Sequence, residues 1–238
     1  MKTKKLFSYF TLVRKMILYN LRIIFANKFV WFLAGAVAFY LGLSVIYVLS
    51  NEVSQMEDLY GVFIFSGVLL VFYPAVFGIQ NDQDARTIEI LFGIPNYRYK
   101  VWLVRIVLIF FISTLIMLGF TFLSNILIIR FNFFEVTVQV MMPVIFLGMM
   151  AFMLSTVIRN GNGTAVVMMI FGLFFLILQE PLRKSQWNVF LNPFNPAYDV
   201  NETTWALITI KNRIILLAGS IIFLLAALLN LQKREKFM

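Results

Sequence analysis

Long uncharged apolar stretches alternate with short charged segments along almost the whole chain. A helix that crosses the hydrocarbon core of a bilayer needs about 20 apolar residues. The pattern therefore predicts an all-α integral membrane protein with six transmembrane helices in a single domain, residues 1–238. We expect the spans at 29–49, 59–81, 103–128, 136–158, 163–180 and 213–231.

The stretch 4–27, ahead of the first span, has polar residues at steps of three or four, which places them on one face of a helix. A basic amphipathic helix lies in the membrane interface. We therefore predict an interfacial helix here, with Lys4, Lys15 and Arg22 at the lipid head groups. The alternative is a positively charged flank without a defined helix.

Composition supports the membrane class, because 61% of residues are hydrophobic and 13% are charged, against about 25% charged in soluble domains. Positive residues concentrate in the cytoplasmic loops of membrane proteins. With the N-terminus inside, five of the 20 Lys and Arg fall in outer segments and the other 15 in inner ones. Both termini are thus expected in the cytoplasm. The net charge of +9 then reflects topology and lipid contact, and no nucleic acid partner is expected.

Smaller features give further expectations. Ala34, Ala38 and Gly42 would let the first span approach another helix closely, either inside the chain, which we favour, or at a dimer seam. Arg105 would snorkel to the inner surface. The glycine-rich stretch 159–163 predicts a tight turn. The outer loop 181–212 predicts turns followed by a short interfacial helix at 203–210.

The most charged interruption, residues 82–100, lies between the second and third spans. Asp82, Arg86 and Glu89 are spaced by four and three residues, so a helix would place them on one face. Leu91 and Phe92 lie on another side. The residues Gly93 and Pro95 would end this helix, and Arg98 and Lys100 follow at the membrane interface. This pattern favours a docking element over a solvated loop that only fixes topology.

Residue types that are missing exclude some chemistry. The chain has no Cys and no His, which rules out disulfides, Cys or His zinc sites and the commonest general base. Seven methionines lie in the fourth and fifth predicted spans. Thioethers bind Cu(I), but they also fill gaps in apolar cores, and packing is the favoured reading. No metal site is expected. The methionines are Met141, Met142, Met149, Met150, Met153, Met168 and Met169.

The segment has an acidic residue followed by Arg86, the run Thr87-Ile-Glu-Ile-Leu91, Pro95 and basic residues that enter the third span. This pattern resembles the permease family of type-2 ATP-binding-cassette (ABC) exporters. The resemblance implies an amphipathic elbow helix at 4–27, short outer helices within 181–212 and a coupling helix at 82–93. The family segment often opens Glu-Arg-Glu and carries a Gly before the Thr, whereas this one opens Asp82-Gln83-Asp84-Ala85. The implied ATPase-coupling residues are Asp82, Asp84, Arg86, Glu89, Leu91 and Phe92.

The chain lacks a Gly-rich phosphate loop followed by Lys-Ser or Lys-Thr, so we do not expect an enzyme. The resemblance implies a permease subunit in the bacterial cytoplasmic (inner) membrane. It would pair with a second copy or a related permease and be driven by a cytoplasmic ABC ATPase that binds ATP and Mg²⁺. An uncharged pathway suits a lipid, lipid-linked glycan, drug or peptide, although no substrate-binding residue is identified. The alternatives are a self-contained secondary transporter or channel, and a membrane enzyme binding Mg²⁺ at Asp82, Asp84 and Glu89.

Overall fold

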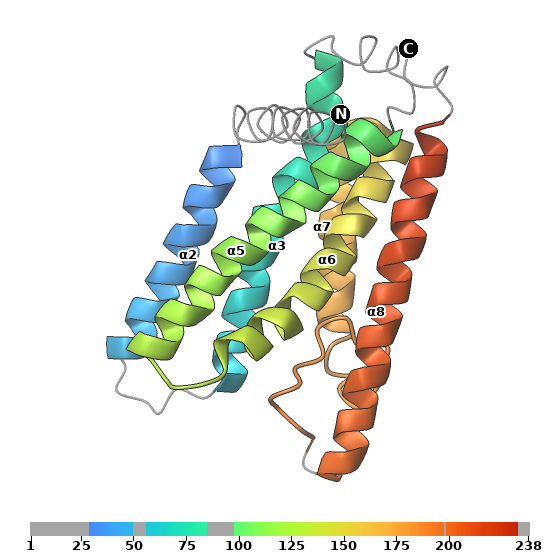
Figure 1. Ribbon diagram of the computed structural model, residues 1–238. Helices are drawn as coiled ribbons and strands as arrows, with labels where there is room; N and C mark the ends of the chain where they lie inside the picture. The colour runs from blue at the N-terminus through green and yellow to red at the C-terminus, as the bar shows by residue number, and fades with distance from the viewer. Residues whose placement is uncertain (1–28, 50–55, 85–97, 198, 233–238) are drawn as a thin grey trace, which may run out of the picture.

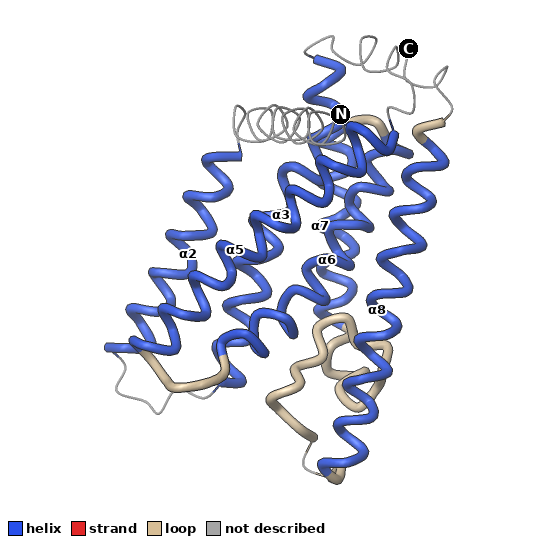
Figure 2. The backbone as a smooth tube through the Cα atoms, viewed as in Figure 1, coloured by secondary structure: helices blue, strands red, loops and turns tan. Residues whose placement is uncertain are grey.

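The computed structural model describes residues 29–49, 56–84, 98–197 and 199–232. Within these ranges the chain forms helices, turns and loops and no strand (Figures 1 and 2). The expected elbow helix at 4–27, with Lys4, Lys15 and Arg22, lies outside the described residues, as do Arg86, Glu89, Leu91 and Phe92. The helices are α2 (Phe29–Leu49), α3 (Met56–Asp84), the π-helix η1 (Arg98–Leu103), α5 (Val104–Leu127), α6 (Phe133–Ile158), α7 (Gly161–Ile177) and α8 (Glu202–Asn230).

The long helices run alternately up and down (Figure 1). The starts of α2, α5 and α7 and the ends of α3, α6 and α8 lie together at the top of Figure 1, which we call the upper end. The opposite ends form the lower end. The helix ends that flank residues 85–97 therefore lie on the same side as the ends next to both terminal segments.

Five of the described helices are long and apolar enough to cross a membrane, and α7 is a shorter apolar helix of 17 residues. Each of these six helices lies at one of the six predicted spans. The bounds of α2 are those predicted, and the bounds of the other five differ. The second helix is longer than predicted at both ends, and α7 ends at Ile177, where turns replace the predicted last residues of the span.

The centre of the bundle is formed by α3 and α6, and α6 also packs extensively on α8. Two glycines allow close approaches, Gly67 between α3 and α6 and Gly148 between α6 and α5. A Cβ at Gly67 of α3 would lie 2.7 Å from Cγ2 of Val144 on α6, and a Cβ at Gly148 would lie 2.8 Å from Cζ of Phe110 on α5. Side chains therefore fill the space that these glycines leave, as close packing in a protein interior requires.

The predicted tight turn between α6 and α7 is confirmed. Arg159 is left-handed, with φ of 60°, and ends α6 in the conformation common after helices. The side chain of Asn160 then accepts a hydrogen bond from the backbone N–H of Gly163 at 2.9 Å and caps α7. Two residues thus reverse the chain at the upper end.

The prediction of a separate interfacial helix at 203–210 was wrong, because α8 is one continuous helix from Glu202 to Asn230. The sequence has no Pro in this stretch, and Asn212 and Arg213, which seemed to mark the membrane boundary, are buried inside the helix bundle. The polar pair is satisfied by other elements, so the helix has no reason to break there.

The favoured reading of Ala34, Ala38 and Gly42 was also wrong, since all three are exposed on α2. The opposite face of α2 makes the internal contacts. Tyr40 is fully buried there, donates from its hydroxyl to the carbonyl oxygen of Phe120 at 2.9 Å, and stacks on the ring of the same residue. By contrast, the methionines behave as packing residues, because Met141, Met150 and Met168 belong to the buried clusters.

Candidate functional site

The predicted coupling residues within the described ranges lie at the upper end of α3. Asp82 and Asp84 belong to the last turn of α3, and Arg98 and Lys100 fall in the first turn of η1. Asp84 is exposed, but only 4% of the surface of Asp82 is accessible. Asp82 therefore lies inside the helix bundle, whereas Asp84 faces outward.

Asp82 forms a buried ion pair with Arg105, the residue expected to snorkel to the surface. Nη1 of Arg105 donates to Oδ2 of Asp82 at 2.8 Å, and the two side chains are 4% and 6% exposed. The guanidinium also lies 4.7 Å from the ring centroid of Trp102, a cation–π contact. Arg105 stays inside because α3 supplies a counterion, so the pair ties the end of α3 to the start of α5.

A second link joins the same end of α3 to α7. The side-chain oxygen of Gln80 accepts a hydrogen bond from the backbone N–H of Gly161, the first residue of α7. Any larger residue at Gly161 would run into Phe77 and Gln80. Within two residues, α3 is therefore anchored to α5 through Asp82 and to α7 through Gln80.

At the lower end, Arg213 of α8 holds three elements together. Its Nε donates to the side-chain oxygen of Gln139 on α6 at 2.7 Å, and Nη2 donates to the hydroxyl of Tyr60 on α3 at 3.0 Å and to the carbonyl of Leu191 at 3.2 Å. Arg213 is 8% exposed. No carboxylate pairs with it among the described residues, so polar neutral groups alone solvate this buried cation.

Asparagine side chains fold the loop between α7 and α8 onto the lower end. Asn212 Nδ2 donates to the carbonyls of Gln186 and Asn188 at 2.9 and 2.8 Å. Asn192 Nδ2 donates to the carbonyl of Glu57 at 3.0 Å, which fixes the loop to the first turn of α3. Because its backbone carbonyl groups accept these hydrogen bonds, the loop packs against the lower end of the bundle (tan in Figure 2).

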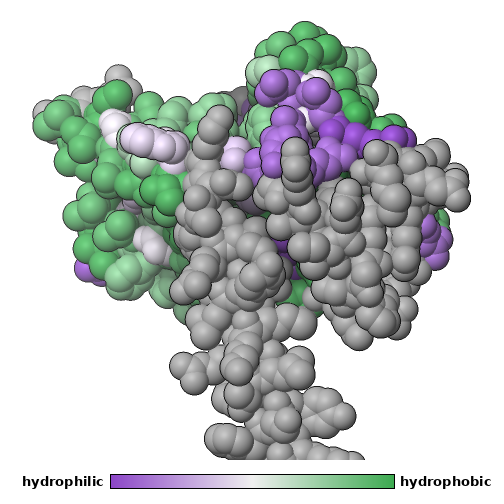
Figure 3. Space-filling view, turned by 90° about the horizontal axis from the view of Figure 1, so that it is seen from above, coloured by the Kyte–Doolittle hydropathy of each residue, from purple (hydrophilic) through white to green (hydrophobic). Residues whose placement is uncertain are grey.

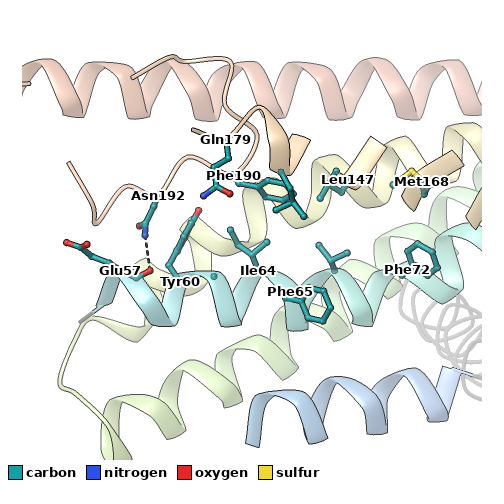
Figure 4. A pocket seen from close by; sticks show the side chains of 14 residues that line it. Glu57, Tyr60, Ile64, Phe65, Phe72, Leu147, Met168, Gln179, Phe190 and Asn192 are labelled. Atoms are coloured by element: carbon teal, nitrogen blue, oxygen red, sulfur yellow. Dashed lines mark hydrogen bonds between the residues drawn. The ribbon is translucent and has the colours of Figure 1, made fainter. Parts of the chain in front are cut away.

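An apolar groove of about 300 Å³ lies between α3, α6 and α7, next to this loop (Figure 4). The labelled side chains show its polarity. Glu57, Gln179 and Asn192 gather at one end, and Ile64, Phe65, Leu147, Met168 and Phe72 follow along the groove. The remaining lining residues are Tyr60, Gly61, Val68, Gly172, Leu176 and Phe190.

A polar chamber of about 280 Å³ adjoins the groove at its lower end. Glu57, Gln179, Phe190 and Asn192 line both spaces, so the two lie next to each other. The chamber adds charged and polar groups and a single indole. These additional residues are Asp58, Glu180, Arg183, Asn188, Asn195 and Trp205.

Sequence reasoning missed the Arg213 cluster and the groove. Arg213 was counted as an outer-segment charge because it sits, next to Asn212, at the edge of an apolar window. The sequence signal for the Arg213 cluster was Gln139, a strongly polar residue inside the fourth predicted span. An amide side chain away from water needs a hydrogen-bond partner, so Gln139 pointed to a polar neighbour on another element. No pattern in a single helix predicts the groove, because its walls come from three helices and a loop.

The class of protein follows from the coarse features. The described elements are helices joined by turns and loops, and the long helices suit a bilayer. In the view from above, hydrophobic residues lie to the left of and above a smaller hydrophilic area (Figure 3). We conclude that it is an integral membrane protein. Comparison with protein-family models, curated proteins and solved structures finds no match to this chain.

Proposed function

We propose that this protein is the permease subunit of an ATP-driven transporter, an exporter of the type-2 ABC kind. It would span the bacterial cytoplasmic membrane with both termini in the cytoplasm and form the pathway as a dimer, with a second copy or a related permease. A separate cytoplasmic ATPase would bind ATP and Mg²⁺ and dock on residues 82–100. The cargo class we propose is amphipathic.

The observation that carries the proposal is the double anchorage of the upper end of α3. The docking segment continues directly from α3, and the Asp82–Arg105 pair and the Gln80–Gly161 bond connect that helix to α5 and α7. A displacement of the segment by an ATPase would therefore act on three helices together. Packed elements move as discrete units rather than deforming continuously.

Arg86, Glu89 and the apolar residues after them supply the contact chemistry in this proposal. The buried pair changes the role of Asp82, which becomes a positioning residue at the base of the segment, while exposed Asp84 stays available to a partner. The mixed charges and the apolar ridge of Leu91 and Phe92 suit a protein surface, because central interface contacts are apolar and rims are polar.

Co-purification tests the proposal. The tagged chain is isolated in detergent, and the expected companion is an ATPase with a Gly-rich nucleotide-binding loop. The double variant Arg86→Glu/Glu89→Lys should lower its yield at least tenfold, whereas the exposed lower-end control Lys211→Glu should leave it unchanged. An ATPase that is absent from the wild-type preparation, or retained equally by both variants, refutes the docking proposal.

A self-contained carrier is the second candidate, and one observation favours it. Ion-coupled carriers place ionisable groups inside the membrane region, and Asp82, Arg105 and Arg213 are buried within the helices. All three have partners, however. Transport by the purified chain in liposomes without any ATPase would support this candidate and contradict the first.

A further inference from the structure

We propose that the groove and the polar chamber together bind one amphiphile, with an apolar chain and a positively charged amine head. The binding is a property of this chain alone. Describing the ligand as transported cargo rests on the proposed function.

The apolar half is open along one side of α3. It extends from Glu57 to Phe72, which are fifteen positions apart on the helix and so about 22 Å apart at about 1.5 Å per residue. Its volume of about 300 Å³ lies at the lower end of small-molecule pockets, which begin at about 300 Å³. At Gly172, on the α7 wall, an added Cβ would meet no atom within 4 Å, so the space there is free.

The polar half is negatively charged. Glu57, Asp58 and Glu180 contribute three negative charges and Arg183 one positive charge, which gives a formal −2. Nη2 of Arg183 donates to the side-chain oxygen of Asn195 at 3.2 Å. Among the described residues, none of the three carboxylates takes part in an ion pair. They are therefore available to a cationic group.

The adjacency of the apolar groove and the acidic chamber selects the ligand. A small inorganic cation would have no use for the apolar groove, and an anionic amphiphile would meet like charges at the chamber. A neutral lipid gains nothing from the three acids. An alkylamine suits both halves. Its apolar chain is removed from water when it lies in the groove, and its ammonium group remains among the carboxylates of the chamber.

Direct binding tests this assignment. The full chain is placed in phosphatidylcholine nanodiscs and titrated with dodecylamine carrying a dansyl group at the far end of its chain. The matched probe is dansyl-labelled dodecanoate, and empty nanodiscs give the background. We expect saturable binding of the amine at least tenfold tighter than that of the carboxylate, equivalent to about 1.4 kcal/mol.

Two variants separate the halves of the site. The triple variant Glu57→Gln/Asp58→Asn/Glu180→Gln should abolish the preference for the amine. Gly172→Phe should block the groove and remove saturable binding of both probes. Gly119→Phe is the matched control, because Gly119 on α5 also has open space around its Cβ and does not line the groove, so binding should be unchanged.

Equal affinity for amine and carboxylate in the wild type overturns the proposal, as does undiminished binding by Gly172→Phe. A groove already filled by phospholipid or by a second copy gives no saturable signal above empty nanodiscs, and this result also overturns it. The assay contains neither ATPase nor ATP. Failure here therefore leaves the co-purification result standing, and loss of ATPase docking leaves selective amine binding intact.

Discussion

Neutralising Asp82 gives the sharpest test of the link between α3 and α5. Asp82→Asn keeps the size of the side chain but leaves the guanidinium of Arg105 buried without its carboxylate, in a site where both side chains are less than a tenth exposed. Removing one member of a buried ion pair costs about 3–5 kcal/mol. For a domain of 150–250 residues, about 1 kcal/mol shifts Tm by about 2–4 °C, so we expect a loss of about 6–20 °C.

The assay is thermal unfolding in detergent, followed by the fraction that remains monodisperse on size exclusion. Asp84→Asn, two residues away and exposed, is the control and should change Tm by less than about 2 °C, as expected for a surface substitution within about 0.5 kcal/mol. The double variant Asp82→Asn/Arg105→Gln removes the stranded charge and should recover most of the loss. If Asp82→Asn and Asp84→Asn behave alike, the pair does not join the two helices.

Three further substitutions have defined outcomes in the same assay. Gly67→Ala forces α3 and α6 apart and should cost about 1–3 kcal/mol, whereas Gly35→Ala meets open space and should be neutral or stabilising by up to about 1 kcal/mol. Arg213→Gln leaves buried polar partners unsatisfied, at about 1–3 kcal/mol for each lost partner. The hydrogen bond from Lys184 lowers the pKa of exposed Asp199 below its usual 3.8. Lys184→Met should therefore cause a small decrease in Tm at pH values above 3.8. It should cause no change in Tm once the pH falls below the lowered pKa.

The sign of the pH effect follows from linkage. A carboxyl group whose pKa is lower in the folded protein stabilises it above the unfolded pKa, and this stabilisation disappears as the pH falls through the folded value. A Tm difference that grows on acidification would contradict the assignment. For the Arg213 substitution, the control is Lys211→Ala, an exposed position two residues earlier on α8. Equal losses of Tm in the two variants would refute the buried network.

The positions of the membrane helices were predictable because a bilayer demands long apolar runs, and the α6–α7 turn was predictable from its glycines. The contacts at the helix ends were not. Asp82 and Arg105 are 23 residues apart, so helical spacing offered Arg86 as a partner for Asp82 and could not reveal the neighbour on the next helix. The exposed stripe of Ala34, Ala38 and Gly42 shows the same limit, because small residues permit close packing without choosing a partner.

The unbroken α8 has a related cause. Charged residues mark where a helix enters water only when no buried partner is present, and Arg213 finds Tyr60 and Gln139 on two other helices. The groove depends on the same kind of information, since Gly172 becomes a wall of a cavity only when α3 and the loop after α7 lie opposite it.

The central claim is that residues between α3 and α5 receive an ATPase. The chain has no cysteine, so Glu89→Cys offers one unique site for a photoreactive maleimide in intact membranes. The account predicts a cross-linked adduct with an ABC ATPase from position 89, and none from Thr204→Cys at the exposed start of α8. An adduct from position 204 alone, or no ATPase adduct from any position in 85–97, would contradict it.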